Sequence, residues 1–149
     1  MSFNNDYSLH VQKFLNTRSL ADLRDQHGVK YRFSDDMRKM TVNYDQIEVT
    51  NNDRLSQQCR GTILARVNNE PFENDENAVV GFTKVVARPF DRFFNLGQVE
   101  AANIDWTSAK FFNKEDGTLI ICYFDAFQNR WHVATRAVPE ANLPIDGYD

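Results

Sequence analysis

The pattern of apolar and polar positions begins as that of a helix. Tyr7, Val11, Phe14 and Leu15 recur at the spacing that places side chains on one helical face. The positions between them are mostly polar. The pattern therefore predicts a first amino-terminal helix that begins at Asp6 and turns one apolar stripe toward a core.

A second short helix is predicted directly after the first. Ser19 is a favourable cap, and Asp22 stands where an acidic side chain can return a hydrogen bond to that cap. Gly28 is expected to end the helix, because glycine accepts the left-handed backbone that closes many helices. Residues 1–28 are therefore interpreted as a helical amino-terminal segment.

After Gly28 the pattern changes to that of β-strands. Short runs of β-branched and aromatic residues alternate with polar stretches, of which residues 68–77 are an acidic surface loop. Pro89 ends one run, because proline cannot donate a hydrogen bond to a neighbouring strand. The predicted strands are VKYRF (29–33), TVNYDQIEV (41–49), CRGTILARV (59–67), AVVGFTKVVAR (78–88) and WTSAKFFN (106–113).

Two further runs predict a β-hairpin around DAFQN. TLIICYF (118–124) is apolar at consecutive positions, which favours a central strand that is buried on both faces. RWHVATR (130–136) alternates instead, and places His132, Ala134 and Arg136 on one face. Together the patterns predict an α+β fold class, with amino-terminal helices on a largely antiparallel β-sheet.

Composition and charge narrow the possible functions. The chain has 149 residues, 42% of them hydrophobic, which suits one globular domain. A net charge of −4 does not support general nucleic-acid binding, so any site for a polyanion must be local. Lys84 and Arg88, which share one face of their strand, are candidates for a basic stripe. Because neither a signal peptide nor a membrane span is found in the sequence, we expect a soluble, cytoplasmic protein.

Cysteine and histidine usage predicts neither a disulfide framework nor a metal site. Cys59 and Cys122 are far apart in the sequence, and the three histidines are scattered. We therefore expect both thiols to be buried and reduced, and assign no metal-ligating residue.

The segment FFNKEDGTLIICYF, residues 111–124, contains a K-x-D-G tetrad at the entrance to a strand. In isolation, the lysine of such a tetrad is most simply a solvated surface charge. As a nucleophile it needs help, because an amine near its ordinary pKa of about 10.4 is protonated at neutral pH. Phe111, Phe112 and the apolar strand are expected to dehydrate Lys114 and thereby lower its pKa.

Four blocks in order, QCRGTILA, VVARPFDRFFNLG, KEDGTLIICYFD and WHVATRA, resemble the ATP-dependent RNA ligases of the T-even phage RNA ligase 1 type. The resemblance runs from Tyr31 to Arg136. It implies a partial covalent nucleotidyltransferase domain of the ATP-grasp-like ligase kind. On this reading residues 1–149 are a single, incomplete adenylation domain, and residues 29–136 are its sheet-rich catalytic part.

The resemblance assigns the tetrad its roles. Lys114 is implied to be the nucleophile that attacks the α-phosphate of ATP and becomes lysyl-AMP. Asp116 is expected to orient the lysine or the nucleotide, and Gly117 to permit positive φ or a close approach of the backbone. Glu115 is expected to contact the adenine through its backbone. For Asp116 and Gly117, an ordinary Asp-Gly turn is the alternative.

The other blocks, with a weaker and looser similarity at TVNYDQ that contains Tyr44, supply five further nucleotide-binding candidates. Arg60 and Arg136 match arginine and basic positions that contact phosphates in the family, and a surface ion pair or a solvated strand end are the alternatives. Arg92 stands where the family more often has lysine, so a planar cation replaces a point charge. Phe94 and Tyr44 either contact the ligand or pack in the core.

The implied reaction has three steps: formation of lysyl-AMP, transfer of AMP to an RNA 5′-phosphate, and sealing by an RNA 3′-hydroxyl. ATP and Mg²⁺ are the expected cofactors, and RNA ends, tRNA among them, the expected partners in RNA repair. The family's later glutamate, E-G and K-x-K blocks are not found in the printed residues. We therefore expect poor ligation by this chain alone, and a complementary carboxy-terminal segment or subunit as a further partner.

Two other functions stay open from the sequence. DNA ligases and mRNA capping enzymes share a lysine tetrad of this kind, and differ in the acceptor of the nucleotide. A noncatalytic nucleotide-binding or RNA-binding module, or a subunit that holds half of a site, belongs to a different class.

Overall fold

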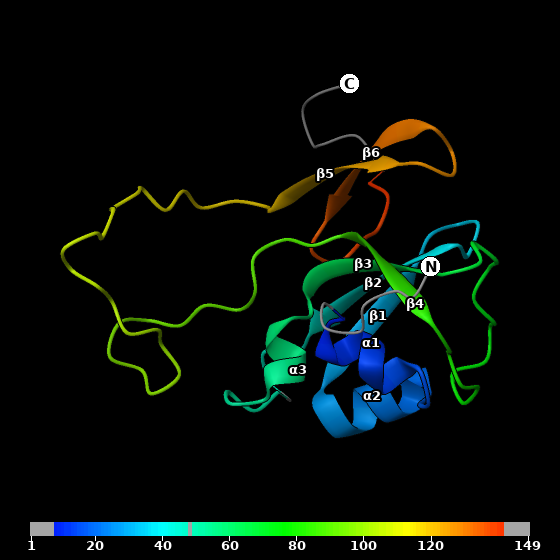
Figure 1. The fold of residues 1–149 in the computed structure, drawn as a ribbon, viewed down its shortest axis with the longest axis horizontal. Helices are drawn as coiled ribbons and strands as arrows, with labels where there is room; N and C mark the ends of the chain where they lie inside the picture. The colour runs from blue at the N-terminus through cyan, green and yellow to red at the C-terminus, as the bar shows by residue number, and fades with distance from the viewer. Residues whose placement is uncertain (1–7, 48, 142–149) are drawn as a thin grey trace.

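The structure, a computed structural model, describes residues 8–47 and 49–141. Figure 1 shows its layers: three helices lie on one side of a four-stranded sheet, and a two-stranded hairpin lies on the other side. Among the described residues, no helix has the length and apolar character needed to cross a membrane. The elements are α1 (His10–Leu15), α2 (Leu20–His27), β1 (Val29–Phe33), β2 (Lys39–Tyr44), α3 (Arg54–Gln57), β3 (Arg60–Arg66), β4 (Thr83–Ala87), β5 (Ile120–Asp125) and β6 (Arg130–Thr135).

The second helix is capped as its sequence predicts. The Asp22 backbone N–H donates to the Ser19 hydroxyl at 3.1 Å, and the Ser19 N–H donates to the Asp22 carboxylate at 3.2 Å. Gly28 ends α2 in the left-handed conformation, with φ +59°. The first helix is also confirmed, although the predicted start at Asp6 and the apolar Tyr7 lie outside the described residues.

The four-stranded sheet is antiparallel throughout, in the order β1-β2-β3-β4. Successive side chains of β3 point to opposite faces, so that Leu64 joins the helices while Ile63 faces the hairpin. The α+β class with helices on an antiparallel sheet is therefore confirmed. The core under the helices contains Leu9, Val11, Leu15, Leu20, Leu23, Val29, Met40, Val42, Leu55, Cys59, Leu64, Phe72 and Val80.

The β5–β6 hairpin forms where the sequence places it, but the prediction that its first strand is central is wrong. Among the described residues β5 pairs with β6 alone, and its side chains alternate between buried and exposed. Ile121 and Tyr123 pack on the sheet, whereas Ile120 and Phe124 face outward. Cys122 shares the outward face, so the expectation of two buried thiols holds for Cys59 and fails here.

The strand predicted at residues 106–113 is also wrong. This segment belongs to a long arch between β4 and β5 (Figure 1), in which the structure assigns no strand. Asp105 explains the failure, because its carboxylate accepts hydrogen bonds from the Thr107 backbone N–H at 3.0 Å and from the Ser108 hydroxyl at 2.7 Å. Such local bonds close a turn at the point where a strand would begin.

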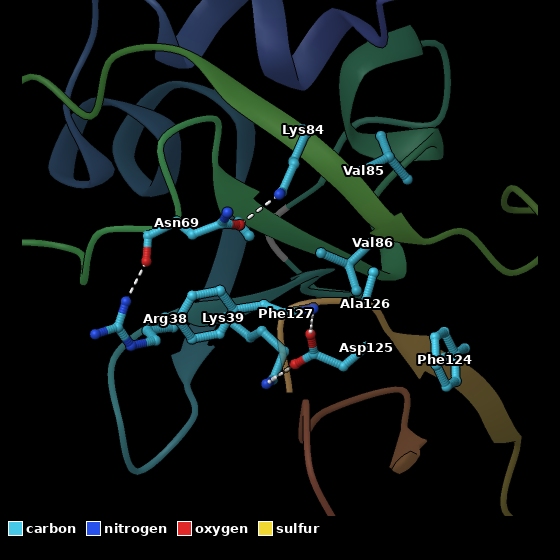
Figure 2. A pocket seen from close by; sticks show the side chains of 11 residues that line it. Arg38, Lys39, Asn69, Lys84, Val85, Val86, Phe124, Asp125, Ala126 and Phe127 are labelled. Carbon is cyan, nitrogen blue, oxygen red and sulfur yellow. Dashed lines mark hydrogen bonds and ion pairs between the residues drawn. The ribbon is translucent and has the colours of Figure 1, made fainter. Parts of the chain in front are cut away.

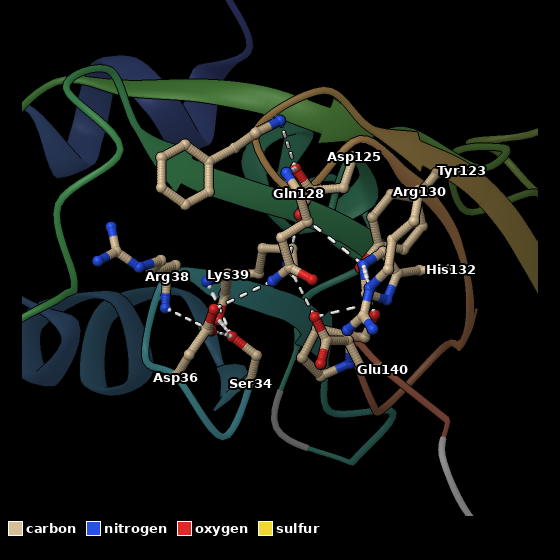
Figure 3. Close-up of polar contacts among 12 residues, drawn as sticks. Ser34, Asp36, Arg38, Lys39, Tyr123, Asp125, Gln128, Arg130, His132 and Glu140 are labelled. Carbon is tan, nitrogen blue, oxygen red and sulfur yellow. Dashed lines mark hydrogen bonds and ion pairs between the residues drawn. The ribbon is translucent and has the colours of Figure 1, made fainter.

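A buried ion network fastens the hairpin to the sheet (Figure 3). Lys39, at the start of β2, is only 3% exposed, and its ammonium lies 2.6 Å from Asp125 and 2.8 Å from Glu140. His132 stacks on Tyr123 and has Glu140 3.6 Å from its Nδ1 atom. One cation thus joins β2, the end of β5 and the segment that follows β6.

The network shifts the pKa values of its members. Burial acts to raise the pKa of the Asp125 carboxyl, but hydrogen bonds from Lys39 and the Gln128 backbone hold that pKa below its ordinary value. Burial also acts to lower the pKa of Lys39, yet its two carboxylate partners raise the pKa overall. Burial lowers the pKa of His132, which agrees with an Arg130 N–H that donates to its Nε2 atom at 3.2 Å.

Removing the central cation should loosen the hairpin. Lys39→Met leaves Asp125 and Glu140 buried without their partner, and we expect the free energy of unfolding to fall by about 3 kcal/mol. Lys13→Met, on the exposed side of α1, should change it by less than about 0.5 kcal/mol. Urea unfolding at neutral pH measures both variants, and equal stability of the two would contradict the role of Lys39.

Stability should also fall with acidity in two stages. The pKa of His132 is depressed below 6.5 and that of Asp125 below 3.8, so both groups bind protons more readily in the unfolded chain. Their stabilisation is therefore present above these values, and is lost first below about pH 6.5 and then below about pH 4. Urea midpoints measured from pH 8 to pH 3 test this, and a midpoint that rises on acidification from pH 7 would refute it.

Candidate functional site

Five of the nine predicted site residues gather at one end of the two sheets. Tyr44 closes β2, and its backbone N–H donates to the carbonyl of Cys59 at 2.7 Å, which places Arg60 beside it. Arg136 follows the end of β6 on the facing hairpin. We call these residues the arginine cluster: Tyr44, Arg60, Arg92, Phe94 and Arg136.

The ring of Tyr44 lies at the centre of the cluster. The guanidinium groups of Arg92 and Arg136 lie 5.0 Å and 5.1 Å from its centroid, which is the geometry of cation–π contacts. Arg92 also lies 4.9 Å from the ring of Phe94. Since Tyr44 is buried, core packing and arginine positioning are two roles of the same side chain.

Arg92 is fixed by hydrogen bonds, but one of its guanidinium nitrogens has no hydrogen-bond partner among the described residues. Its backbone N–H donates to Gln57 at 2.8 Å, and its Nη2 atom donates to the side-chain oxygen of Asn51 at 2.7 Å. Its Nη1 atom is buried and has no hydrogen-bond partner among the described residues. Buried donors are nearly always paired, so this nitrogen identifies a place where an acceptor oxygen fits.

The three arginines of the cluster form no ion pair with the described residues. Arg60 stacks on Phe93 at 5.0 Å, and within residues 8–47 and 49–141 no carboxylate lies within 4.0 Å of its guanidinium or of those of Arg92 and Arg136. The nearby acid, Asp91, is bonded instead to Arg88 at 2.9 Å. Arginines at one end of the sheets without carboxylate partners suit a phosphate group.

Gly61 makes the cluster possible, and sequence reasoning did not single it out. Pairing between β2 and β3 slips at this point, so that Asn43 pairs with Arg60 and Val42 with Thr62. Gly61 takes up the extra position at φ +90°, and a Cβ atom there would come within 2.9 Å of the Arg136 Cα. A glycine inside a predicted strand is a known signal for such a bulge and close approach.

The lysine tetrad lies outside the cluster, near the end of the long arch. The Lys114 side chain is 76% exposed, and its amine lies 3.8 Å from Asp116. Gly117 has the positive φ, +148°, that its expected role allows. Phe111 and Phe112 are each 85% exposed, so the expectation that they dehydrate the lysine is wrong for this conformation. Glu115 is exposed as well.

The described part of the chain contains no group of three His, Cys, Asp or Glu side chains that could hold a metal ion. The arginine cluster offers donors and rings, which do not ligate Mg²⁺. Any magnesium at this site would therefore be held by ligand oxygens and water.

Comparison with known proteins finds similarity over most of the chain. Residues 58–144 match the family described as RNA ligase, a range that includes every predicted site residue except Tyr44. Over 139 residues the chain is 30% identical to the "Putative bifunctional polynucleotide kinase/RNA ligase" of Autographa californica nuclear polyhedrosis virus. The similarity covers 86% of this chain and 18% of that protein, so the chain spans less than a fifth of the length of this relative.

A methyl group at Gly61 should displace Arg136 and destabilise the fold. Gly61→Ala combines an unfavourable φ with a 2.9 Å clash, whereas Gly97→Ala has a similar φ, +87°, and no neighbour within 4 Å. We therefore expect Gly61→Ala to lower the free energy of unfolding by about 2 kcal/mol more than Gly97→Ala does. Thermal and urea unfolding compare them, and equal losses would mean that the close approach is unimportant.

Proposed function

The chain belongs to the RNA ligase family of the phage T4 type, and we propose that it carries the adenylation chemistry of an ATP-dependent ligase. The observation that best supports this is the meeting of Arg92 and Arg136 at the ring of Tyr44, with Arg60 on the neighbouring strand and, within residues 8–47 and 49–141, no carboxylate within 4.0 Å of the three guanidinium groups. A triphosphate is the ligand that such a cluster fits by charge and by donor geometry.

In the first proposed step Lys114 is the nucleophile. Its neutral amine attacks the α-phosphorus of ATP, the bond from that phosphorus to the bridging oxygen breaks, and pyrophosphate leaves. The amine loses its proton to solvent, which leaves AMP joined to the Nζ atom of Lys114. Arg92 and Arg136 stabilise the charge on the phosphate oxygens, since electrostatic stabilisation is the main contribution of a protein to phosphoryl transfer.

Two further steps complete the proposed ligation. An oxygen of an RNA 5′-phosphate attacks the phosphorus of lysyl-AMP, and the lysine nitrogen leaves with a proton. The 3′-hydroxyl of a second RNA end then attacks the activated 5′-phosphate, loses its proton and releases AMP. Broken RNA ends, such as those of a cleaved tRNA, are the proposed substrates, and RNA repair the proposed role.

The exposure of Lys114 sets a condition on this chemistry. The amine must approach the α-phosphate, whereas in this structure it stands in solvent on the arch. We propose that the triphosphate, once bound by the arginine cluster, draws the tetrad toward it. Asp116 and the backbone of Glu115 and Gly117 would then contact the nucleotide. Dehydration of the amine would occur in that bound state.

The groups that complete the site are proposed to come from outside the printed residues. Family carboxylates for metal and ribose, and paired lysines for the triphosphate, are not present in this sequence. In the family these groups stabilise charge that develops during phosphoryl transfer, so their absence should weaken sealing. We therefore propose a complementary segment or subunit as a partner for full ligation.

Covalent labelling tests the assignment of the nucleophile. With α-labelled ATP and magnesium, the chain should acquire label, and Lys114→Ala should reduce it by at least about a thousandfold, because the attacking atom is removed. Lys110→Ala is the matched control: this lysine is also exposed and lies on the same arch, so its loss should leave the labelling within about twofold.

The outcomes separate the proposals. Label that survives Lys114→Ala would refute this nucleophile. Absence of label on every variant, with ATP still bound, would favour the noncatalytic nucleotide-binding function. Efficient joining of RNA ends by the chain alone would contradict the need for a partner, whereas label without joining is the expected result.

A further inference from the structure

A second basic site lies at the other end of the sheets from the arginine cluster. It is a pocket of about 240 Å³ between the start of β2, the end of β3, the β4 strand and the turn of the β5–β6 hairpin (Figure 2). Its charged lining residues are Arg38, Lys39, Lys84 and Asp125. Lys39 is shared by Asp125 and Glu140 within the ion network, so Arg38 and Lys84 are the lining cations that stand outside that network.

Both of these cations bind the same neutral residue, Asn69. Figure 2 shows the Arg38 guanidinium at the backbone carbonyl of Asn69 and the Lys84 ammonium at its side-chain oxygen. Within residues 8–47 and 49–141, neither side chain has a carboxylate within 4.0 Å, although Asp36 is close enough for Arg38 to lower its pKa. Two cations therefore converge on one neutral residue, and in the described part of the chain neither head group forms an ion pair.

The backbone conformation of Asn69 positions it to accept hydrogen bonds from Arg38 and Lys84. It adopts φ +59°, and its N–H donates to the Arg66 carbonyl at 3.0 Å, which closes the turn after β3. Asparagine tolerates this conformation better than most residues. The turn thus fixes the point at which Arg38 and Lys84 meet.

The rest of the pocket is apolar and aromatic. Val85, Val86 and Phe124 form part of its wall, and Phe127 lies at 4.9 Å beneath the guanidinium of Arg38. The aromatic surface continues out of the pocket, because Phe124 meets Trp131 edge-to-face at 5.6 Å on the outer face of the hairpin. Trp131 is 71% exposed. Paired cations beside exposed rings are what single-stranded nucleic acids require, with phosphates on the cations and bases on the rings.

We propose that this pocket and the rings beside it bind a segment of single-stranded RNA, with one backbone phosphate between Arg38 and Lys84 and adjacent bases on Phe127 and Trp131. The site is separate from the arginine cluster, and its occupation does not depend on adenylation of Lys114. Its function would be to hold a strand whose end is presented elsewhere on the protein.

Binding of a fluorescein-labelled, single-stranded RNA oligonucleotide without ATP, followed by anisotropy at several salt concentrations, tests this proposal. Arg38→Gln with Lys84→Gln should weaken binding about tenfold near 0.1 M salt and reduce the slope of log affinity against log salt by about 1.4. Lys13→Gln with Arg32→Gln is the matched control, since it removes two exposed cations that do not line the pocket. The control pair should keep the affinity within about twofold.

Trp131→Ala provides a second variant with a different signature. Loss of stacking should weaken binding about tenfold while the salt slope stays unchanged, because no cation is removed. The Arg38 and Lys84 variant should keep its labelling from ATP, so failure of this proposal can be told apart from failure of the proposed adenylation.

Two results would overturn the assignment. Equal losses in the test pair and the control pair would mean that general charge, not this pocket, binds the RNA. Displacement of the oligonucleotide by AMP at equal concentration would identify the ligand as a free nucleotide instead of a strand.

Discussion

The ion pair between Lys39 and the carboxylates of Asp125 and Glu140 is the contact on which the arrangement of both sites depends. The hairpin contributes few buried apolar residues to its contact with the sheet, chiefly Ile121, Tyr123 and Ala134 around Ile63. The buried ammonium of Lys39 and its two carboxylate partners orient the hairpin on this small apolar contact. Any other orientation would leave the buried ammonium without its carboxylates, which lowers the stability of the fold. The pair therefore fixes which end of the hairpin meets which end of β2.

That fixed orientation determines what lies at the opposite end. With Asp125 held at the start of β2, the antiparallel hairpin carries Arg136 back toward Tyr44 at the end of β2. Gly61, at the bulge in β3, has no side chain, so the backbone of Arg136 can approach it closely. A strand pairing, one buried cation and one glycine thus bring together arginines that are distant in the sequence.

Local signals made part of this structure predictable. Ser19, Asp22 and Gly28 act through neighbours in the sequence, so the second helix could be read directly. The hairpin could also be placed, but not the exposure of one face of β5, because an apolar run does not reveal whether both faces are covered. The strand expected at residues 106–113 failed through the side-chain hydrogen bonds of Asp105. Nothing in the sequence marks Lys39 as buried, since its partners are distant residues.

In the candidate site, too, local sequence signals could be read, whereas contacts between distant residues could not. The basic and aromatic residues of the cluster were identified by resemblance, but their contacts arise from the register of β2 and β3 and from the docking of the hairpin. Lys114 has the opposite character, since its motif is obvious in the sequence and its side chain has few protein contacts in the structure. Tyr44, Arg60 and Arg136 lie in or directly after strands, whereas Arg92 and Phe94 lie on the same arch as Lys114, close to the end of β4. Under the proposed function, a triphosphate bound by the cluster would be in place before the amine of Lys114 reaches it.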